Sequence, residues 1–196
     1  FLSRIEWSLD DFRLSRDSIE HEVQALASRL EGKAELHFSD ELPRVAIFVS
    51  KQSHCLFDLL MRTRSGELPM EVPLVIANHP DLKQLCQDFG VHFECIPFSK
   101  ERKLEAEVIM LKLLAEYRIE FAVLAKYMQV LSATFLEKFP TVINIHHSFL
   151  PAFKGGQPYH RAWDRGVKLI GATAHYVTEK LDDGPIIDQS VIQVSH

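Results

Sequence analysis

Polar side chains gather at the end of an apolar stretch, in the segment NIHHSFLP that runs from Asn144 to Pro151. The preceding Val and Ile residues favour a β-strand, in which side chains alternate between the two faces. Asn144 and His146 then share one face, with about 7 Å between their Cα atoms, and His147 points to the other. An amide and an imidazole placed in this way can both aim at one small group. The pair therefore indicates either an active centre or two polar residues that only satisfy the hydrogen bonds of a loop.

A metal site is the first alternative for these histidines. His146 and His147 point in opposite directions in a strand, so their adjacency does not make a chelate. His160 and His175 could approach them in the folded chain, but no ligand-spacing motif links the four residues. We therefore expect no metal here.

A phosphate-binding loop is the second alternative, because Gly155 and Gly156 follow the segment. In nucleotide-binding α/β folds the glycine-rich turn follows the first strand and opens a helix. The corresponding turn in this chain, residues 50–54, reads SKQSH and contains no glycine. This argues against a nucleotide site, and we interpret the two glycines as part of a turn.

Strands and helices alternate from residue 44 onward, and this alternation must position the polar residues. Continuously apolar strands alternating with helices predict an α/β fold with a Rossmann-like, mostly parallel sheet covered by helices on both faces. In such sheets ligands bind at the carboxyl ends of the strands, which is where Asn144 and His146 lie. The predicted strands span residues 44–50, 72–78, 92–98, 120–125 and 141–147, the predicted helices span 54–63, 81–90, 100–119 and 132–140, and two final strands within 170–194 flank a loop at 180–185.

The first forty residues have a different pattern. Residues 1–9 and 34–40 alternate like half-buried strands, and residues 15–32 carry an apolar stripe of helical period that ends at Gly32. Strand, helix and strand in forty residues are too few to enclose a core. We interpret residues 1–40 as the end of a small α+β domain and residues 41–196 as a second domain. Because the chain starts at Phe1 and stops after an apolar run, we expect a longer protein with further residues at both ends, including an incomplete C-terminus.

Composition excludes several classes of protein. Of 196 residues, 46% are hydrophobic and 25% are charged, which is ordinary for a soluble globular protein. The formal net charge of −5 gives no electrostatic reason to expect nucleic acid or an anionic membrane as a partner. Cys55, Cys86 and Cys95 show no CxxC spacing, so we expect reduced thiols in a cytoplasmic protein.

Three motifs in order resemble the folate-dependent formyltransferase/hydrolase family over about residues 43–196. The segment NIHHSFLP resembles the family's Asn-x-His-x-Ser-x-Leu-Pro signature, HYVTEKLDDGPII resembles its second motif, and VLAKYMQVLS resembles its folate-binding segment. The resemblance implies that Asn144, His146 and Asp182 form the catalytic trio and that His175 supports it. Gln129 departs from the family pattern, in which arginine is commoner.

Within the family the chain is most similar to the hydrolase branch. The turn at residues 50–54 lacks the Gly/Ser-rich loop that holds the phosphate of glycinamide ribonucleotide in transferases, and HHS stands where transferases usually have HPS. Residues 151–162 also resemble the hydrolase version of the following loop, and residues 1–40 resemble the end of an ACT-type ligand-binding domain. The resemblance implies hydrolysis of the C–N amide bond of 10-formyltetrahydrofolate to formate and tetrahydrofolate, which supplies formate for purine synthesis and balances one-carbon pools.

The expected chemistry assigns a role to each residue. Asn144 and His146 would stabilise the oxyanion formed when water attacks the formyl carbon, and Asp182 would assist proton transfer. Ser148 is expected to fix the loop, because no general base is placed to activate it. His147 is a further supporting residue. The folate-binding residues that the resemblance implies are Met128, Gln129, Val130, Leu131, Thr178 and Asp183.

Two other functions stay open at this point. One is formyl transfer from 10-formyltetrahydrofolate to a small amine such as glycinamide ribonucleotide, and the other is a non-catalytic folate or amino-acid sensor. The folate is expected as substrate, without a prosthetic group or metal. The resemblance also implies methionine or glycine as an effector of the ACT-type domain, and a homo-oligomer.

Overall fold

The computed structural model describes residues 3–10, 12–99 and 101–194. The chain divides into two compact units, Phe1–Glu41 and Leu42–His196. Each unit is considered by itself.

Among its described residues the first unit contains one helix, α1 (Arg16–Arg29), within the helical range predicted from the sequence. The side chain of Ser15 caps it by accepting a hydrogen bond from the backbone N–H of Ser18. The strands predicted at residues 1–9 and 34–40 are absent from the described residues of those ranges, so that prediction was wrong there. A strand leaves its N–H and C=O groups without partners unless another strand lies beside it, and the described part of this unit offers none.

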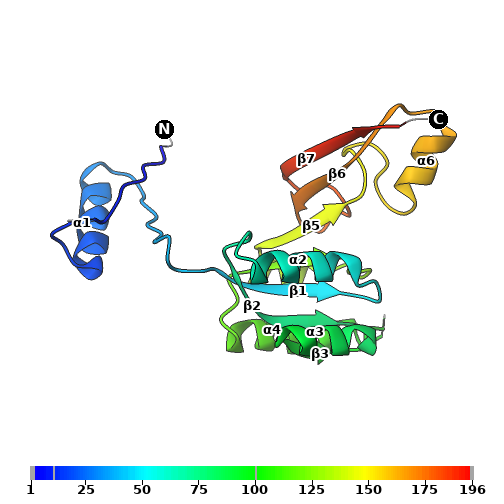
Figure 1. Ribbon diagram of the computed structural model, residues 1–196, viewed down its shortest axis with the longest axis horizontal. Helices are drawn as coiled ribbons and strands as arrows, with labels where there is room; N and C mark the ends of the chain where they lie inside the picture. The colour runs from blue at the N-terminus through cyan, green and yellow to red at the C-terminus, as the bar shows by residue number, and fades with distance from the viewer. Residues whose placement is uncertain (1–2, 11, 100, 195–196) are drawn as a thin grey trace. The chain divides into compact units, whose positions relative to one another are not determined.

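The second unit is built on a seven-stranded sheet with the strand order β3-β2-β1-β4-β5-β6-β7 (Figure 1). The first five strands in this order are parallel, whereas β6 pairs with β5 and β7 pairs with β6 in the antiparallel sense. The predicted mostly parallel α/β sheet is therefore confirmed. The strands are β1 (Arg44–Val49), β2 (Glu71–Ala77), β3 (His92–Cys95), β4 (Phe121–Ala125), β5 (Val142–His146), β6 (Leu169–Tyr176) and β7 (Ile186–Gln193).

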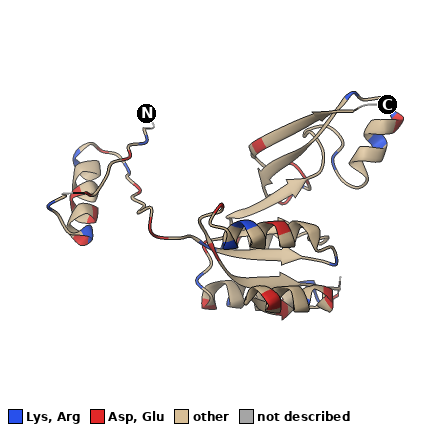
Figure 2. Ribbon diagram, in the orientation of Figure 1, with Lys and Arg blue, Asp and Glu red and all other residues tan. Residues whose placement is uncertain are grey.

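Alternate residues of the parallel strands enter two separate cores. Phe48 of β1 packs with residues of α4 and α5, whereas its neighbours Ile47 and Val49 pack with residues of α2 and α3. Figure 2 shows the charged residues concentrated on helices and loops, with β1 and β2 free of charge over most of their length. A sheet that is apolar on both faces requires such a helical cover on each side. The helices of this unit are α2 (His54–Arg64), the 3₁₀-helix η1 (Pro80–Leu82), α3 (Lys83–Phe89), α4 (Lys103–Glu116), α5 (Ala133–Lys138) and α6 (Pro158–Asp164).

Local sequence signals explain where several helices begin and end. Gly90 adopts the left-handed conformation that ends α3, and Ser132 caps α5 by accepting a hydrogen bond from the Phe135 N–H. The short helix α6 was not predicted. It begins at Pro158, whose ring fixes a helical φ and whose missing N–H is not needed in the first turn.

Two general features of the described residues complete the fold. Among the described residues, no helix combines the length and the apolar character needed to cross a bilayer. All three cysteines are free, and burial raises the pKa of the Cys86 thiol to about 11.

Candidate active site

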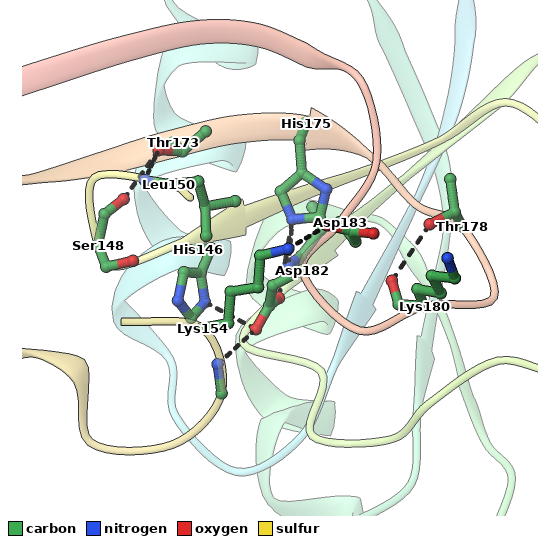
Figure 3. A network of polar contacts seen from close by, with 12 residues as sticks. His146, Ser148, Leu150, Lys154, Thr173, His175, Thr178, Lys180, Asp182 and Asp183 are labelled. Atoms are coloured by element: carbon green, nitrogen blue, oxygen red, sulfur yellow. Dashed lines mark hydrogen bonds and ion pairs between the residues drawn. The ribbon is translucent and has the colours of Figure 1, made fainter. Parts of the chain in front are cut away.

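The carboxylate of Asp182 lies between two histidines at the carboxyl end of β5 (Figure 3). Its Oδ2 is 3.3 Å from Nδ1 of His146, and its Oδ1 is 3.8 Å from Nε2 of His175. All three side chains are at most 6% exposed. Asn144 joins them through its Nδ2, which is 3.2 Å from Nε2 of His175. The structure thus brings together the expected catalytic trio of Asn144, His146 and Asp182, with His175 beside it.

Sheet register explains why these residues meet. Asn144 and His146 are two apart on β5, and Asn144 lies directly opposite His175 of the antiparallel strand β6. Directly opposed residues in an antiparallel pair share a face of the sheet. The loop from β6 to β7 then returns Asp182 to the same face.

Both ring nitrogens of His146 face groups that can only accept hydrogen bonds. Nδ1 faces the Asp182 carboxylate, and Nε2 is 3.2 Å from the backbone carbonyl oxygen of Phe153. A neutral imidazole has one N–H, whereas an imidazolium has two. The doubly protonated ring therefore satisfies this arrangement completely, as an ion pair with Asp182.

Two hydrogen bonds of His175 suit a ring with its proton on Nδ1. Its Nδ1 is 2.9 Å from the carbonyl oxygen of Tyr176, which only accepts, so Nδ1 carries the proton. Nε2 is then free to accept a hydrogen bond from the amide of Asn144. Asn144 has a second amide N–H, which can serve a ligand in the pocket that this residue lines.

Backbone geometry holds Asp182 in place. Asp182 has a φ of 52°, in the left-handed region that residues other than glycine rarely occupy. Its Oδ2 accepts a hydrogen bond of 2.9 Å from the backbone N–H of Gly155. Gly184 follows where the loop passes so close to Tyr176 that an added Cβ would overlap the Tyr176 carbonyl oxygen. The glycine of the LDDGP segment is thus required by this close approach.

Replacing Gly184 with alanine should displace the loop that carries Asp182. We expect kcat/KM for the expected substrate, 10-formyltetrahydrofolate, to fall more than about tenfold, because the carboxylate is displaced. The free energy of unfolding should fall by about 1–3 kcal/mol, because overpacking forces the backbone to move. Steady-state kinetics and thermal denaturation measure the two effects. Gly156→Ala is the matched control, since no atom lies within 4 Å of a Cβ added there. Equal effects of the two substitutions would show that the close approach at Gly184 is unimportant.

A pocket opens beside the cluster, between the segment after β4 and the loop after β6. Of the predicted folate-binding residues, four line it: Gln129, Val130, Leu131 and Thr178. Met128 and Asp183 do not. Met128 is 71% exposed, and its backbone N–H donates a hydrogen bond to Ser50 Oγ. Asp183 pairs with Lys154. The other lining residues are Leu124, Tyr127, Asn144, His175, Val177, Lys180, Leu181 and Asp182.

The remaining predicted residues lie around the cluster. Ser148 donates a hydrogen bond of 2.8 Å to the carbonyl oxygen of Ala152, within the loop after β5. His147 is half-buried, with its ring 5.4 Å from that of His146 and 5.5 Å from that of Tyr159. Burial, followed by the nearby charges of Lys126 and His146, lowers the pKa of His147.

Sequence reasoning missed the two backbone contacts to this cluster, from the Phe153 carbonyl and the Gly155 N–H. The only sequence signal was the Gly155–Gly156 pair, which indicated a turn without indicating what the turn contacts. His160, considered above as a ligand candidate, is exposed on α6. Over the described ranges, no three His, Cys, Asp or Glu residues are grouped so that they could hold a metal ion.

The chain is similar to a known protein family and to several named enzymes. The formyl transferase family model matches residues 43–196. The formyltetrahydrofolate deformylase of Synechocystis is 58% identical over 196 residues, covering 100% of this chain and 69% of the relative. That of Bacillus subtilis is 43% identical over 197 residues, covering 100% of this chain and 66% of the relative. The chain thus spans about two thirds of the length of these relatives.

Two kinds of enzyme of known structure resemble the chain. A formyltetrahydrofolate deformylase from Burkholderia mallei matches with a TM-score of 0.87 and 44% identity, covering 94% of this chain and 66% of that one. A glycinamide ribonucleotide transformylase from Symbiobacterium toebii matches with a TM-score of 0.74 and 28% identity, covering 83% and 79%. With a family model that matches most of its length and relatives of this similarity, the chain belongs to the formyl transferase family.

Proposed function

We propose that the protein is a formyltetrahydrofolate deformylase, which hydrolyses 10-formyltetrahydrofolate to formate and tetrahydrofolate. The observation that carries the proposal is the buried contact of Asp182 with His146, beside Asn144 and at the edge of a pocket. The names of relatives 43–58% identical to the chain support the choice of reaction within the family. Formate released in this way would supply purine synthesis and balance one-carbon pools.

The two hydrogen-bond donors of the cluster suit the formation of the tetrahedral intermediate in this reaction. Water adds to the formyl carbon, and the carbonyl oxygen becomes an oxyanion in the tetrahedral intermediate. The free amide N–H of Asn144 would donate a hydrogen bond to it. The Nε2–H of His146 would donate a second one, with the oxyanion replacing the Phe153 carbonyl as acceptor. Preorganised donors of this kind are typically worth about 10²–10³-fold each.

Asp182 would serve the proton transfers. As an acceptor beside His146 it holds that imidazolium in place, and it can take a proton from the attacking water. The proton then passes to N10 of the folate, which leaves as the C–N bond breaks. Hydrogen bonds from the Gly155 N–H and from His146 orient the carboxylate for this role.

The pocket would hold the pterin end of the folate. Val130 and Leu131 provide apolar walls, and Gln129 and Thr178 provide polar groups at its edge. We retain Met128 and Asp183 as candidate folate contacts, through the Met128 backbone and by closure of the Thr178–Asp183 loop on the ligand. His175 supports the site by orienting Asn144, Ser148 by fixing the loop after β5, and His147 from the opposite side of β5.

Formyl transfer to glycinamide ribonucleotide is the second candidate, and the 28% identity to a transformylase of known structure favours it. The turn between β1 and α2 argues for water instead. It contains no glycine, whereas phosphate-binding turns of α/β folds are rich in glycine so that the backbone N–H groups can approach the phosphate. A phosphate would find Lys51 as the obvious partner among residues 50–54.

One assay separates these functions. The full-length protein should release formate from 10-formyltetrahydrofolate with water alone, at a rate that glycinamide ribonucleotide does not raise. Turnover that depends strictly on the amine would identify a transferase. Folate binding without turnover in either condition would identify a sensor and overturn both catalytic proposals.

The N-terminal unit is proposed to be the C-terminal part of an ACT-type regulatory domain, covering residues 1–40. Its separation as a compact unit with its own helix supports a domain boundary near residue 41. Methionine or glycine would be its effector, and pairing of such domains would give a homo-oligomer. We further propose a cytoplasmic protein that uses the folate as substrate and needs no prosthetic group or metal.

A further inference from the structure

One row of side chains crosses the three strands at the edge of the sheet. His146 of β5 lies opposite Thr173 of β6, and Thr173 lies opposite Gln189 of β7. Directly opposed residues in antiparallel pairs point to the same face. The row therefore joins a residue of the candidate site to two residues that sequence reasoning did not identify.

Thr173 is fully buried and uses the whole hydrogen-bonding capacity of its hydroxyl group. Its Oγ1 donates to the carbonyl oxygen of Ser148 at 2.8 Å. It accepts from the backbone N–H of Leu150 at 3.1 Å and from Nε2 of Gln189 at 3.0 Å. A hydroxyl has one donor and two acceptor positions, so all three are occupied.

Gln189 completes the network from the outer strand. Its amide nitrogen, besides contacting Thr173, donates to the carbonyl oxygen of Leu150 at 2.9 Å. Both N–H groups of the amide are thereby used. Leu150 consequently has its backbone N–H and C=O bound by two side chains, so this point of the loop is fixed to the sheet. Figure 3 shows the part of this network formed by Ser148, Leu150 and Thr173.

The anchored loop continues directly to the candidate site. Three residues after Leu150, the carbonyl oxygen of Phe153 contacts Nε2 of His146. Two residues further on, the N–H of Gly155 donates to Oδ2 of Asp182. We propose that Thr173 and Gln189 are positioning residues that hold the loop at residues 148–155 and, through it, orient His146 and Asp182.

The kinetic consequence rests on the proposed hydrolysis. Neither Thr173 nor Gln189 lines the pocket, so loss of the pair should leave folate affinity nearly unchanged. Small displacements of reacting groups reduce the rate of the chemical step strongly. The pair should therefore act on kcat rather than on KM.

The test uses the full-length protein with three variants and one control. Gln189→Leu and Thr173→Val should each lower kcat by about 10–100-fold, with KM within about twofold of wild type because the pocket is intact. Thr173→Ser, which keeps the hydroxyl, should recover kcat to within about threefold of wild type because it restores all three hydrogen bonds. Gln193→Leu, the same change at an exposed position of the same strand, should have wild-type kinetics.

A measurement that does not need turnover accompanies the kinetics. The ring ¹⁵N signals of His146 should shift in Gln189→Leu, because the Phe153 carbonyl moves away from Nε2, and should stay in place in Gln193→Leu. Gln189 lies on the edge strand, whereas Thr173 is fully buried, so Gln189→Leu is the milder change. The inference can therefore be tested with Gln189→Leu alone if Thr173→Val does not fold.

Two results would overturn the inference. One is a Gln189→Leu protein with wild-type kcat and unchanged His146 signals. The other is a parallel loss of kcat, folate affinity and thermal stability that Thr173→Ser does not rescue, which would make the network merely structural. Absence of formate release by the wild-type protein would instead refute the proposed function, and the His146 signals would then decide on the positioning role.

Discussion

Replacing Asp182 with asparagine is expected to lower kcat by about 100- to 10,000-fold. The amide keeps the size of the carboxylate, but it cannot take a proton from water and it cannot balance the charge of the His146 imidazolium. Those losses correspond to about 3–5 kcal/mol of transition-state stabilisation. Formate release under saturating 10-formyltetrahydrofolate measures kcat. Calorimetric titration with tetrahydrofolate should show binding within about threefold of wild type, because asparagine keeps the size of the one lining residue that changes.

Asp164→Asn provides the matched control for this substitution. Asp164 is an exposed carboxylate at the end of α6, outside the cluster and the pocket, and the same chemical change there should leave kcat at the wild-type value. A wild-type rate in Asp182→Asn would exclude the proposed role of the buried carboxylate, whatever the control shows.

Replacing Asn144 with alanine should lower kcat by about 10²–10³-fold. The substitution removes the N–H that we assign to the oxyanion, and it also removes the donor that satisfies Nε2 of His175. The loss concerns a charge that exists only in the intermediate, so KM should change little and kcat/KM should fall with kcat. Steady-state kinetics over a range of substrate concentrations separates the two constants.

Gln87→Ala controls for amide removal, since Gln87 is exposed on α3. A rise in KM with unchanged kcat in Asn144→Ala would show that Asn144 binds the substrate and the intermediate equally. That outcome would contradict its assignment to the oxyanion.

Much of the catalytic unit was predictable because its determinants are local. Alternation in β5 correctly places Asn144 and His146 on one face, and the Ser132 and Gly90 signals correctly mark helix ends. These features depend on residues within a few positions of each other. The mostly parallel sheet follows from the same local periodicities.

The parts that escaped prediction depend on which strand lies beside which. The opposition of His146, Thr173 and Gln189 is a matter of antiparallel register, and no periodicity in a single strand encodes it. Asp182 was placed in the site by family resemblance, because a carboxylate on a loop is by itself more often a solvated turn residue. The prediction of strands at residues 1–9 and 34–40 was wrong for a related reason. An alternating pattern indicates that one face is apolar, but it does not indicate whether a neighbouring strand is present.

The contact between the Phe153 carbonyl and Nε2 of His146 has a consequence for selectivity. A formyl oxygen that approaches His146 must replace this carbonyl, so binding of the neutral substrate exchanges one neutral acceptor for another and gains little. Once water has added, the same oxygen carries a full negative charge and competes better for the N–H, because the imidazolium attracts an anion more strongly than a neutral carbonyl. The Phe153 carbonyl would thus compete with the substrate oxygen for the His146 N–H more effectively than with the oxyanion. His146 would therefore stabilise the intermediate more than the substrate.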